Sequence, residues 1–517
     1  MFVRLKALIV VLVIALLMFG LGRIALASFA HEADWNRRRN AWVLLTIAAF
    51  AVPGYWWFAV IAAVLLLQAA RRDSNPIALY LLLLHVVPPV QVDLPAIGVN
   101  KLFEIDNYRL LAFCVLIPAV IRFRRANRDS ASLKLDAMDW LLLLWGAIQI
   151  VLFVPPDLPG QPLLQDSPTN FVRRVFLFFP DIYVVYYAVS RMCWSRRMLT
   201  EAMASYCMGA LILAAVAVYE TGRHWLLYVE LTKLWSESSR AGFYLFRGNS
   251  LRAEAAAGHA LALGYLLAIA FGFWLYLKSE MTSRWARIAG TTVLWLGLLA
   301  TYSRGPWVAA FAMYFLNAAL RPGGTVRVVK AAFGAAVLIG LLALTPLGDR
   351  LISALPFGTK SVDAGTVDYR QRLATRSWEL IQQHPVFGNQ TAFMQMGDLR
   401  QGEGIIDFVN SYAQIALFYG LAGLAALMGF MLLGIYRSYL QTRRTQAHLQ
   451  LLGVSLLATI GGVLILLSTT SFIFGLPVMF YVLGGCAAAY SRLIAAVPSE
   501  VPVAPSAPAS PAADRPL

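Results

Sequence analysis

Long apolar runs separated by short polar turns cover most of this sequence. A helix needs about 20 apolar residues to cross the hydrocarbon core of a bilayer, so each run of that length predicts a membrane span. The run at 41–70 carries Pro53-Gly54 near its middle and therefore predicts a tight hairpin of two short helices. In total, about 13 to 15 spans are predicted. The other spans are predicted near 5–27, 75–93, 107–121, 138–154, 175–190, 200–219, 255–277, 288–302, 306–320, 331–346, 412–435, 450–469 and 472–491.

The basic residues lie mainly in the turns, and this distribution predicts how the chain is oriented. The 517 residues are 59% hydrophobic and only 14% charged, with a net charge of +16. Cytoplasmic loops of membrane proteins carry an excess of Lys and Arg, so we interpret the charge as a topology signal and expect no nucleic-acid partner. The predicted fold class is an all-α, polytopic transmembrane protein in a lipid bilayer. The basic turns expected on the cytoplasmic side are 122–125, 191–197, 278–287, 321–330 and 437–444.

One long polar interval, from Asp349 to Asn410, interrupts the alternation of apolar runs and turns. The positive-inside rule places it on the extracytoplasmic side, together with the loops at 220–254 and 301–307. The end of the chain is rich in Pro, Ala and Ser, and it is expected to be a disordered cytoplasmic tail. The predicted organisation is transmembrane helices over 1–346, one long extracytoplasmic loop over 347–411, further transmembrane helices over 412–495 and the tail over 496–517.

Motifs for several kinds of chemistry are missing from the sequence. It contains no phosphate-binding loop ending in Gly-Lys-Ser/Thr, no His-Glu-x-x-His and no closely spaced pair of aspartates for a metal-bound nucleotide sugar. The six histidines lie far apart, and the four cysteines show no paired spacing. We therefore expect no metal site and no cofactor. ATP-driven transport and metal-dependent nucleotide-sugar chemistry both lose support.

Two polar clusters lie at predicted outer ends of spans. Arg304 lies between two apolar runs on the predicted outer side. The positive-inside rule explains arginines in cytoplasmic turns, so it does not explain an arginine there. Arg252 and Glu254 lie at the mouth of the span over 255–277, and His259 follows one to two turns into that helix. Ordinary explanations exist for each: an arginine at a span end reaches the headgroups, Arg252 and Glu254 pair with each other, and a buried histidine is most often a satisfied core residue.

A short amphipathic helix is predicted within the polar interval. Apolar residues recur at helical spacing between Asp368 and His384, and Pro385 marks the end. Its arginines have carboxylates at pairing distance, namely Asp368 for Arg372 and Glu379 for Arg376. Alone, this pattern is typical of a solvated surface helix. Together with Arg252 and Arg304 on the same predicted side, it favours an anion site, because the guanidinium fork binds phosphate oxygens in two places.

The order of these motifs resembles the O-antigen ligase and polysaccharide polymerase family of bacterial membrane proteins. The similarity covers roughly residues 250–435. It is carried by Ser303-Arg304-Gly305 at a span junction, then Arg370, Arg372, Trp378, His384-Pro385 and Gly388 in the outer loop, then Asn410-Ser411-Tyr412 leading into a span with Gly420 and Gly423.

This resemblance implies an all-helical glycosyltransferase of the GT-C type in the bacterial inner membrane. Its substrates would be an undecaprenyl-diphosphate-linked oligosaccharide and a glycan acceptor at the periplasmic face, without a metal, and other polysaccharide assembly proteins would be partners. Fixed guanidinium groups would stabilise the diphosphate as it leaves. The candidates for that role are Arg252, Arg304, Arg370 and Arg372.

One departure from the family pattern concerns the general base. Ligases of this family tend to carry a histidine just before the asparagine that ends the loop, but this chain has Val409 there. The departure favours a polymerase over a lipid A-core ligase. A transporter or flippase of lipid-linked oligosaccharide, or a non-catalytic subunit of an assembly complex, remain the alternatives. The candidate bases, which the sequence does not rank, are Glu254, His259, Glu403 and Asp407.

Overall fold

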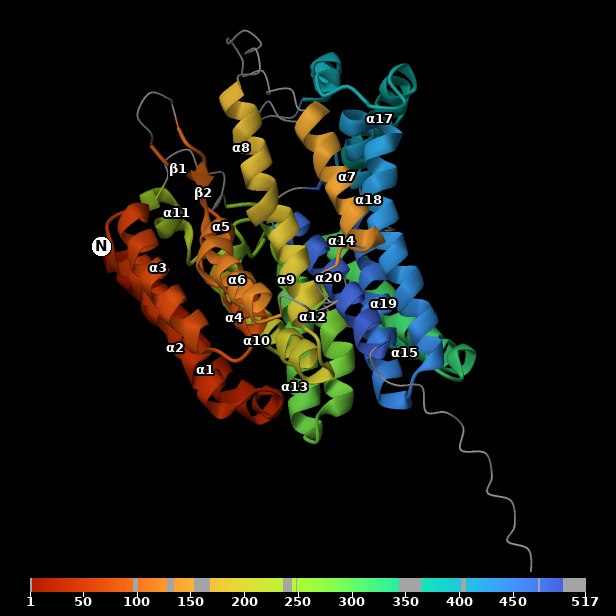
Figure 1. Cartoon of the computed structure of the whole chain (residues 1–517). Coiled ribbons are helices and arrows are strands. Elements are labelled where there is room, and N and C mark those ends of the chain that lie inside the picture. The colour runs from red at the N-terminus through yellow and green to blue at the C-terminus, as the bar shows by residue number, and fades with distance from the viewer. Residues whose placement is uncertain are drawn as a thin grey trace, which may run out of the picture.

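Helices form almost all of the regular structure in the computed structural model of the chain (Figure 1). Only two small antiparallel pairs of strands accompany them in the part that the structure describes: β1 (Val92–Asp93) with β2 (Glu104–Ile105), and β3 (Phe246–Arg247) with β4 (Ser250–Leu251). The described residues are 2–95, 101–127, 134–152, 168–235, 244–247, 249–343, 364–400, 406–472 and 475–495.

The first helices include the predicted hairpin. The break at Pro53-Gly54 separates α2 from α3, which confirms that prediction. The single span predicted over 75–93 is wrong, because α4 ends at Leu83 and the chain then enters β1. Pro88-Pro89 explains this, since proline lacks an amide donor and disfavours a helix before it. The elements are α1 (Phe2–Leu26), η1 (Ala27–Phe29), α2 (Glu32–Ala51), α3 (Tyr55–Arg72), α4 (Pro76–Leu83), α5 (Asn107–Leu111), the π-helix η2 (Ala112–Leu116), α6 (Ile117–Ala126) and α7 (Ala137–Leu152).

The middle of the chain supplies the core of the bundle. Helix α12 is buried along nearly its whole length, as expected for a helix that is apolar on every face. Ser195 and Ser283 each accept a hydrogen bond from a backbone amide three residues on, which fixes the starts of α10 and α13. The elements are α8 (Pro168–Phe178), the π-helix η4 (Phe179–Tyr183), α9 (Val184–Met192), α10 (Arg196–Arg223), α11 (Val229–Trp235), η5 (Ala255–Ala257), α12 (Ala260–Glu280), α13 (Arg284–Ala300), α14 (Arg304–Leu320) and α15 (Gly324–Ala343).

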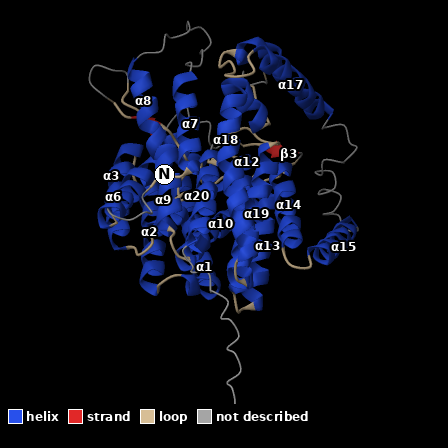
Figure 2. Ribbon diagram, turned by 45° about the vertical axis from the view of Figure 1, so that its right-hand side comes forward, coloured by secondary structure: helices blue, strands red, loops and turns tan. Residues whose placement is uncertain are grey.

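The last elements combine a surface helix with three long bundle helices. Figure 2 shows α17 at one end of the bundle, sloping across the upper right of the view. Its length and position confirm the amphipathic helix predicted inside the polar interval. The elements are α17 (Ala364–Gln383), η6 (Ala392–Leu399), α18 (Ser411–Arg444), α19 (Ala447–Leu467) and α20 (Leu476–Ala495).

Seven helical segments among the described residues are long and apolar enough to cross a membrane. Together with the near absence of sheet, they confirm the predicted all-α, polytopic membrane fold. The predicted tail over 496–517 and the first residues of the predicted loop over 347–411 lie outside the described residues, so the four-part organisation stays a prediction. The seven segments are Phe2–Phe29, Asn170–Met192, Arg196–Arg223, Ala260–Glu280, Ser411–Arg444, Ala447–Leu467 and Leu476–Ala495.

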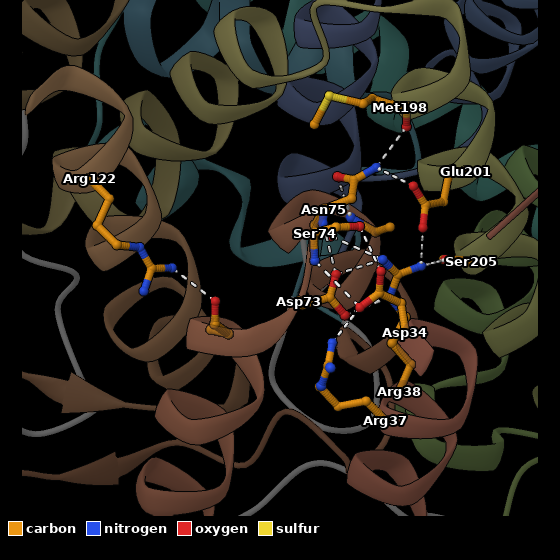
Figure 3. Close-up of polar contacts among 12 residues, drawn as sticks. Asp34, Arg37, Arg38, Asp73, Ser74, Asn75, Arg122, Met198, Glu201 and Ser205 are labelled. Atoms are coloured by element: carbon orange, nitrogen blue, oxygen red, sulfur yellow. Dashed lines mark hydrogen bonds and ion pairs between the residues drawn. The ribbon is translucent and has the colours of Figure 1, made fainter. Parts of the chain in front are cut away.

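A buried ion cluster joins α2, α10 and the turn after α3 (Figure 3). The guanidinium of Arg38 lies 2.6 Å from Asp73 and 2.8 Å from Glu201, and all three side chains are almost completely buried. Asn75 completes the cluster by donating a 3.1 Å hydrogen bond to the second oxygen of Glu201. A buried charge needs such partners to offset its lost hydration, so this arginine also fixes the packing of three helices.

Candidate functional site

Two loops that precede neighbouring helices meet at one end of the bundle. One is the turn at 301–303 before α14, and the other is the loop at 249–259 before α12. The guanidinium of Arg252 donates a 2.8 Å hydrogen bond to the hydroxyl of Ser303 and a 3.2 Å hydrogen bond to the carbonyl of Thr301. Figure 2 shows β3, close to this loop, toward the same end of the bundle as α17. The two arginine motifs expected to act together are therefore in contact.

Local contacts hold the 301–303 turn in its shape. The hydroxyl of Thr301 donates to the carbonyl of Leu298 at 2.7 Å, and the indole of Trp307 donates to the same carbonyl at 2.7 Å. Arg247, from β3, donates a 3.0 Å hydrogen bond to the carbonyl of Tyr302. Arg304 then begins α14, where it is half-buried beside Ser303. The turn is thus fixed from both α13 and the facing loop.

Strained backbone is concentrated around the same place. Ala255, Tyr302 and Val409 have φ values of 44°, 47° and 35°, in the left-handed region that side chains with a Cβ rarely adopt. Among the described non-glycine residues, only His224 shares this property, and its ring contacts the carbonyl of Asn249 in the same loop. Such strain persists only where surrounding contacts over-determine the conformation, and it is frequent at functional sites.

Glu220, near the end of α10, is a residue that the sequence interpretation missed. Its side chain is completely buried and accepts three backbone hydrogen bonds, from Leu227 at 2.9 Å, Glu254 at 3.1 Å and Ala255 at 2.8 Å. It therefore fixes the loop that carries Arg252. A carboxylate at the end of a long apolar run was the available signal, because such groups are costly in a membrane protein and need a partner.

The Arg252 guanidinium lies in a strongly positive environment. Burial and the nearby charge of Arg247 lower its pKa, and the charge of Glu254 opposes this change. Glu254 itself is only 3% exposed. Arg247 contacts the carbonyl of Tyr302 and Arg252 contacts the hydroxyl of Ser303, directly before Arg304 in the chain, so three arginines bring cationic charge to one turn. Such a site is suited to an anion with several oxygens.

His259 caps the start of α12 and lies close enough to Arg252 and Asp407 for both charges to act on its ring. Its Nδ1 atom accepts a 3.2 Å hydrogen bond from the amide of Leu261. Burial and the charge of Arg252 lower the pKa of the ring to about 4, while Asp407 opposes this. The ring is therefore neutral at neutral pH, and because Nδ1 is an acceptor, its proton is assigned to Nε2. This arrangement suits His259 as a hydrogen-bond donor and disfavours it as a base.

Asp407 is held from two sides by polar contacts. Its Oδ1 atom accepts hydrogen bonds from the hydroxyl of Ser471 at 2.8 Å and from the amide of Val409 at 3.3 Å. The hydroxyl of Tyr369, on α17, contacts both the amide and the carbonyl of Asp407 at 3.1 Å. Its Oδ2 atom makes no hydrogen bond within the described part of the chain. A half-buried carboxylate with one fixed and one open oxygen is suited to accept a proton from a bound hydroxyl.

Helix α17 packs through its apolar face and exposes its charged face. Leu373, Leu380 and Ile381 are buried against η6 and the start of α18. The predicted pairs form on the other face, with Arg372 2.9 Å from Asp368 and Arg376 2.8 Å from Glu379. The Arg372 side chain is 55% exposed, and Arg370 is exposed as well. The helix thus reaches the site through Tyr369, whereas Arg372 and Arg376 pair with carboxylates on its exposed face.

The segment after α17 docks onto a break in α18. Gly420 has φ 67° and interrupts the helix, which frees backbone groups for bonds to the docked segment. Leu421 donates to the carbonyl of Pro385 at 2.8 Å, and Asn389 donates to the carbonyl of Leu417 at 2.8 Å. Gly388 and Gly420 approach so closely that a Cβ at either would meet the backbone of the other segment.

The structure brings five of the eight predicted site residues together and leaves the other three apart or unplaced. Arg370 follows Tyr369 on α17, whereas Arg372 lies on the exposed face in its pair with Asp368. Glu403 lies outside the described residues. No three His, Cys, Asp or Glu side chains group to hold a metal ion within the described ranges. The five residues that lie together are Arg252, Glu254, His259, Arg304 and Asp407.

A comparison with protein families matches part of the chain. Residues 289–428 fit the family described as O-antigen ligase. This region belongs to the O-antigen ligase family. The resemblance inferred from the sequence is thus confirmed, and the chain is a multi-pass membrane protein with an enzyme region of the O-antigen ligase and polymerase type. A comparison with curated proteins found no match.

The O-antigen ligase region does not contain the whole site. It includes Arg304 and Asp407, together with the arginines of α17. Arg252 and His259 precede it in the chain, and Arg252 reaches it through the hydrogen bond to Ser303. The charged groups that surround the turn therefore come partly from the loop before α12, which the family match does not cover.

Proposed function

We propose that this chain is a membrane glycosyltransferase that transfers an undecaprenyl-diphosphate-linked glycan to a sugar hydroxyl at the periplasmic face of the bacterial inner membrane. The observation that carries the proposal is the contact between Arg252 and Ser303, which brings Arg252 to the O-antigen ligase region at the residue before Arg304. This contact brings the Arg252 guanidinium to the turn that precedes Arg304, and both arginines are partly buried. Glycan transfer from a lipid diphosphate needs such a group of cations, because negative charge grows on the leaving diphosphate.

The proposed leaving-group site consists of Arg252 and Arg304, with Arg370 and Arg372 on the adjoining surface of α17. Arginine stays charged at any relevant pH, and its planar fork binds two phosphate oxygens at once. The half-buried pair would hold the diphosphate next to the reacting carbon. The exposed pair would attract the lipid-linked substrate and contact its outer sugars or phosphates. These roles extend the site from the bundle to the amphipathic helix.

Asp407 is our choice for the general base. Its Oδ2 atom would accept the proton of the acceptor hydroxyl while the hydroxyl oxygen attacks the anomeric carbon of the lipid-linked sugar. The bond between that carbon and the diphosphate oxygen breaks, and undecaprenyl diphosphate leaves toward the arginines. His259 would donate a hydrogen bond from Nε2, because its Nδ1 atom is occupied by the amide of Leu261. Glu254 would balance the charge of Arg252.

We favour a polymerase over a ligase to lipid A-core. Val409 stands where ligases of the family tend to have a histidine, and the neighbouring Asp407 is fixed by Ser471 and Tyr369. The acceptor would then be the end of a growing polysaccharide. Other proteins of a polysaccharide assembly system would supply the lipid-linked units at the same membrane face.

Purified protein in proteoliposomes tests the proposal with lipid-linked repeat units as the only substrate. Chain growth without movement of lipid between leaflets is the expected result, and Arg304→Ala should abolish it. Arg327→Ala removes the same charge from the first turn of α15 and serves as the control. Movement of the lipid without new glycosidic bonds would instead identify a transporter, and neither activity would indicate a non-catalytic subunit. Normal polymer yield from Arg304→Ala protein would show that the proposed site is wrong.

A further inference from the structure

A second group of cations lies at the far end of the helices that carry the site. Helices α12 and α14 both begin at the site and rise about 1.5 Å per residue, so their last turns lie about 25–30 Å from it. Lys278 is in the last turn of α12, and Arg321 directly follows α14. The last turn of α18 brings Arg443 to the same end. The site and this group therefore face opposite surfaces of the bundle.

A pocket of about 380 Å³ opens between the ends of α14, α18 and α19. Its walls differ in character. One part is polar and cationic, with Arg321, Arg443 and the phenol of Tyr439, and another part is apolar, with Leu320, Val454 and Leu457.

The cations of this pocket have no carboxylate partner among the residues that the structure describes. Arg321 is half-buried, and its Nε atom is buried without a hydrogen bond. Burial and the charge of Arg327 lower the pKa of Arg321. Arg443 stacks on the ring of Tyr439 at 4.8 Å, which leaves the edges of its guanidinium for a ligand. The more deeply buried Arg38 and Arg191 are, in contrast, each paired with a carboxylate.

A second unsatisfied polar group lies one turn before Arg321 on α14. Asn317 is 5% exposed, and its side-chain amide nitrogen has no hydrogen-bond partner within the described ranges. Residues four apart share a helix face, so this donor lies on the same side of α14 as Arg321. A buried donor without a partner is costly, and this one lies near the pocket but outside the residues that line it.

We propose that this pocket binds the phosphate headgroup of an anionic phospholipid from the leaflet opposite the glycan-transfer site. Arg321 and Arg443 would hold the phosphate, and Leu320, Val454 and Leu457 would contact the upper part of an acyl chain. A soluble phosphate has the same oxygens, but it has no apolar group that would contact the apolar side of the pocket. The pocket lies at the ends of α18 and α19, which are long and apolar enough to cross a membrane, so a lipid headgroup would be within its reach. The proposal is independent of the glycan-transfer chemistry.

Native mass spectrometry of the purified full-length protein tests the assignment with a short-chain phosphatidylglycerol as probe. The matched zwitterionic probe is a phosphatidylcholine with the same acyl chains, and inorganic phosphate is the soluble competitor. We expect phosphatidylglycerol to bind and to resist displacement by phosphate. In the double variant Arg321→Gln/Arg443→Gln its affinity should fall about 25-fold, since an arginine near an anionic headgroup changes affinity by about fivefold.

The control is Arg284→Gln/Arg287→Gln, which removes the same charge at the start of α13, at the same end of the bundle but outside the pocket. Its affinity for phosphatidylglycerol should change by about twofold or less. An equal loss in both double variants would show a general effect of charge and overturn the proposal. Equal binding of phosphatidylcholine, or displacement of the lipid by inorganic phosphate, would overturn the assignment to an anionic lipid. Thermal unfolding of both variants verifies that they are folded.

Discussion

The carboxylate of Glu220 accepts a 2.8 Å hydrogen bond from the backbone amide of Ala255, which lies 35 residues further along the chain. Ala255 has a positive φ, and the next contact of the same carboxylate is the amide of Glu254. A buried acidic group at the end of α10 therefore holds a strained turn between Arg252 and His259. The site depends on a residue that would not itself contact a substrate.

Replacing Glu220 by alanine should destabilise the protein. Three buried amides would lose their acceptor, and each unsatisfied group costs about 1–3 kcal/mol, so we expect a loss of about 3 kcal/mol or more in the free energy of unfolding. Thermal unfolding in detergent measures the effect. Glu230→Ala is the control, because that carboxylate is partly exposed and lies 3.6 Å from Lys233, a pair worth about 1 kcal/mol or less. Equal unfolding temperatures for the two variants would contradict the role of Glu220.

Replacing Ser303 by alanine should reduce glycan transfer while leaving the fold intact. Arg252 would lose its 2.8 Å contact to the hydroxyl and keep its contact to the carbonyl of Thr301. A hydrogen bond to a charged group contributes about 1.5–3 kcal/mol, so the transfer rate should fall about tenfold or more. Polymer yield per unit of membrane protein measures it. Ser468→Ala, at an exposed hydroxyl that bonds only to its own helix end, should have no effect.

Replacing Asp407 by asparagine should remove the proposed base with little change in shape. The amide oxygen can still accept from Ser471 and from the amide of Val409. General base catalysis contributes about 100-fold to 10,000-fold, so the transfer rate should fall about 100-fold or more. The assay is single-turnover transfer from a lipid-linked donor. Asp398→Asn, an exposed aspartate in η6, should retain full activity. Retained transfer in the Asp407 variant would assign the base to another group.

Replacing Gly420 by alanine should release the segment at 385–389 from α18. A Cβ there would meet the backbone of Val386, and the left-handed φ of 67° adds a cost of about 1 kcal/mol or more. We expect a lower unfolding temperature and faster proteolysis near this segment. Gly429→Ala lies in the same helix with only ordinary contacts to Leu141, and it should be neutral or slightly stabilising. Equal proteolysis rates for the two variants would contradict the prediction.

The buried ring of His259 should make stability depend on pH. Its folded pKa of about 4 lies below the ordinary value of 6.5, so the unfolded chain binds the proton more readily. The neutral ring therefore makes its full contribution to the free energy of unfolding above the pKa that it has in the unfolded chain. This contribution is lost as the pH falls toward the pKa of the ring in the folded protein. Between pH 6.5 and about pH 5 the free energy of unfolding should fall by about 2 kcal/mol because of this ring. The free energy of unfolding of the His259→Gln variant should differ less between these two pH values than that of the unaltered protein. An unchanged difference would show that the ring does not titrate as expected.

Several features could be predicted from the sequence because their causes are local. The Pro53-Gly54 break marked the hairpin of α2 and α3, and the helical spacing before Pro385 marked α17 with its two ion pairs. The order of motifs around Arg304 indicated the family. Hydropathy alone was less reliable where proline intervened, since the apolar run at 75–93 contains only the short helix α4. A membrane span needs a long apolar run, but such a run does not always form one continuous helix.

The arrangement of the site was decided only by the tertiary structure. Sequence spacing could not place Arg252 against Ser303, 51 residues away, or join Tyr369 of α17 to Asp407. It also could not rank the candidate bases, because the difference between His259 and Asp407 lies in which of their atoms are already hydrogen-bonded. Composition and periodicity determined that this is a helical membrane protein with an arginine-rich polar interval. Helix packing determined which of those arginines meet, since contacts between distant residues depend on how side chains fill the space between helices.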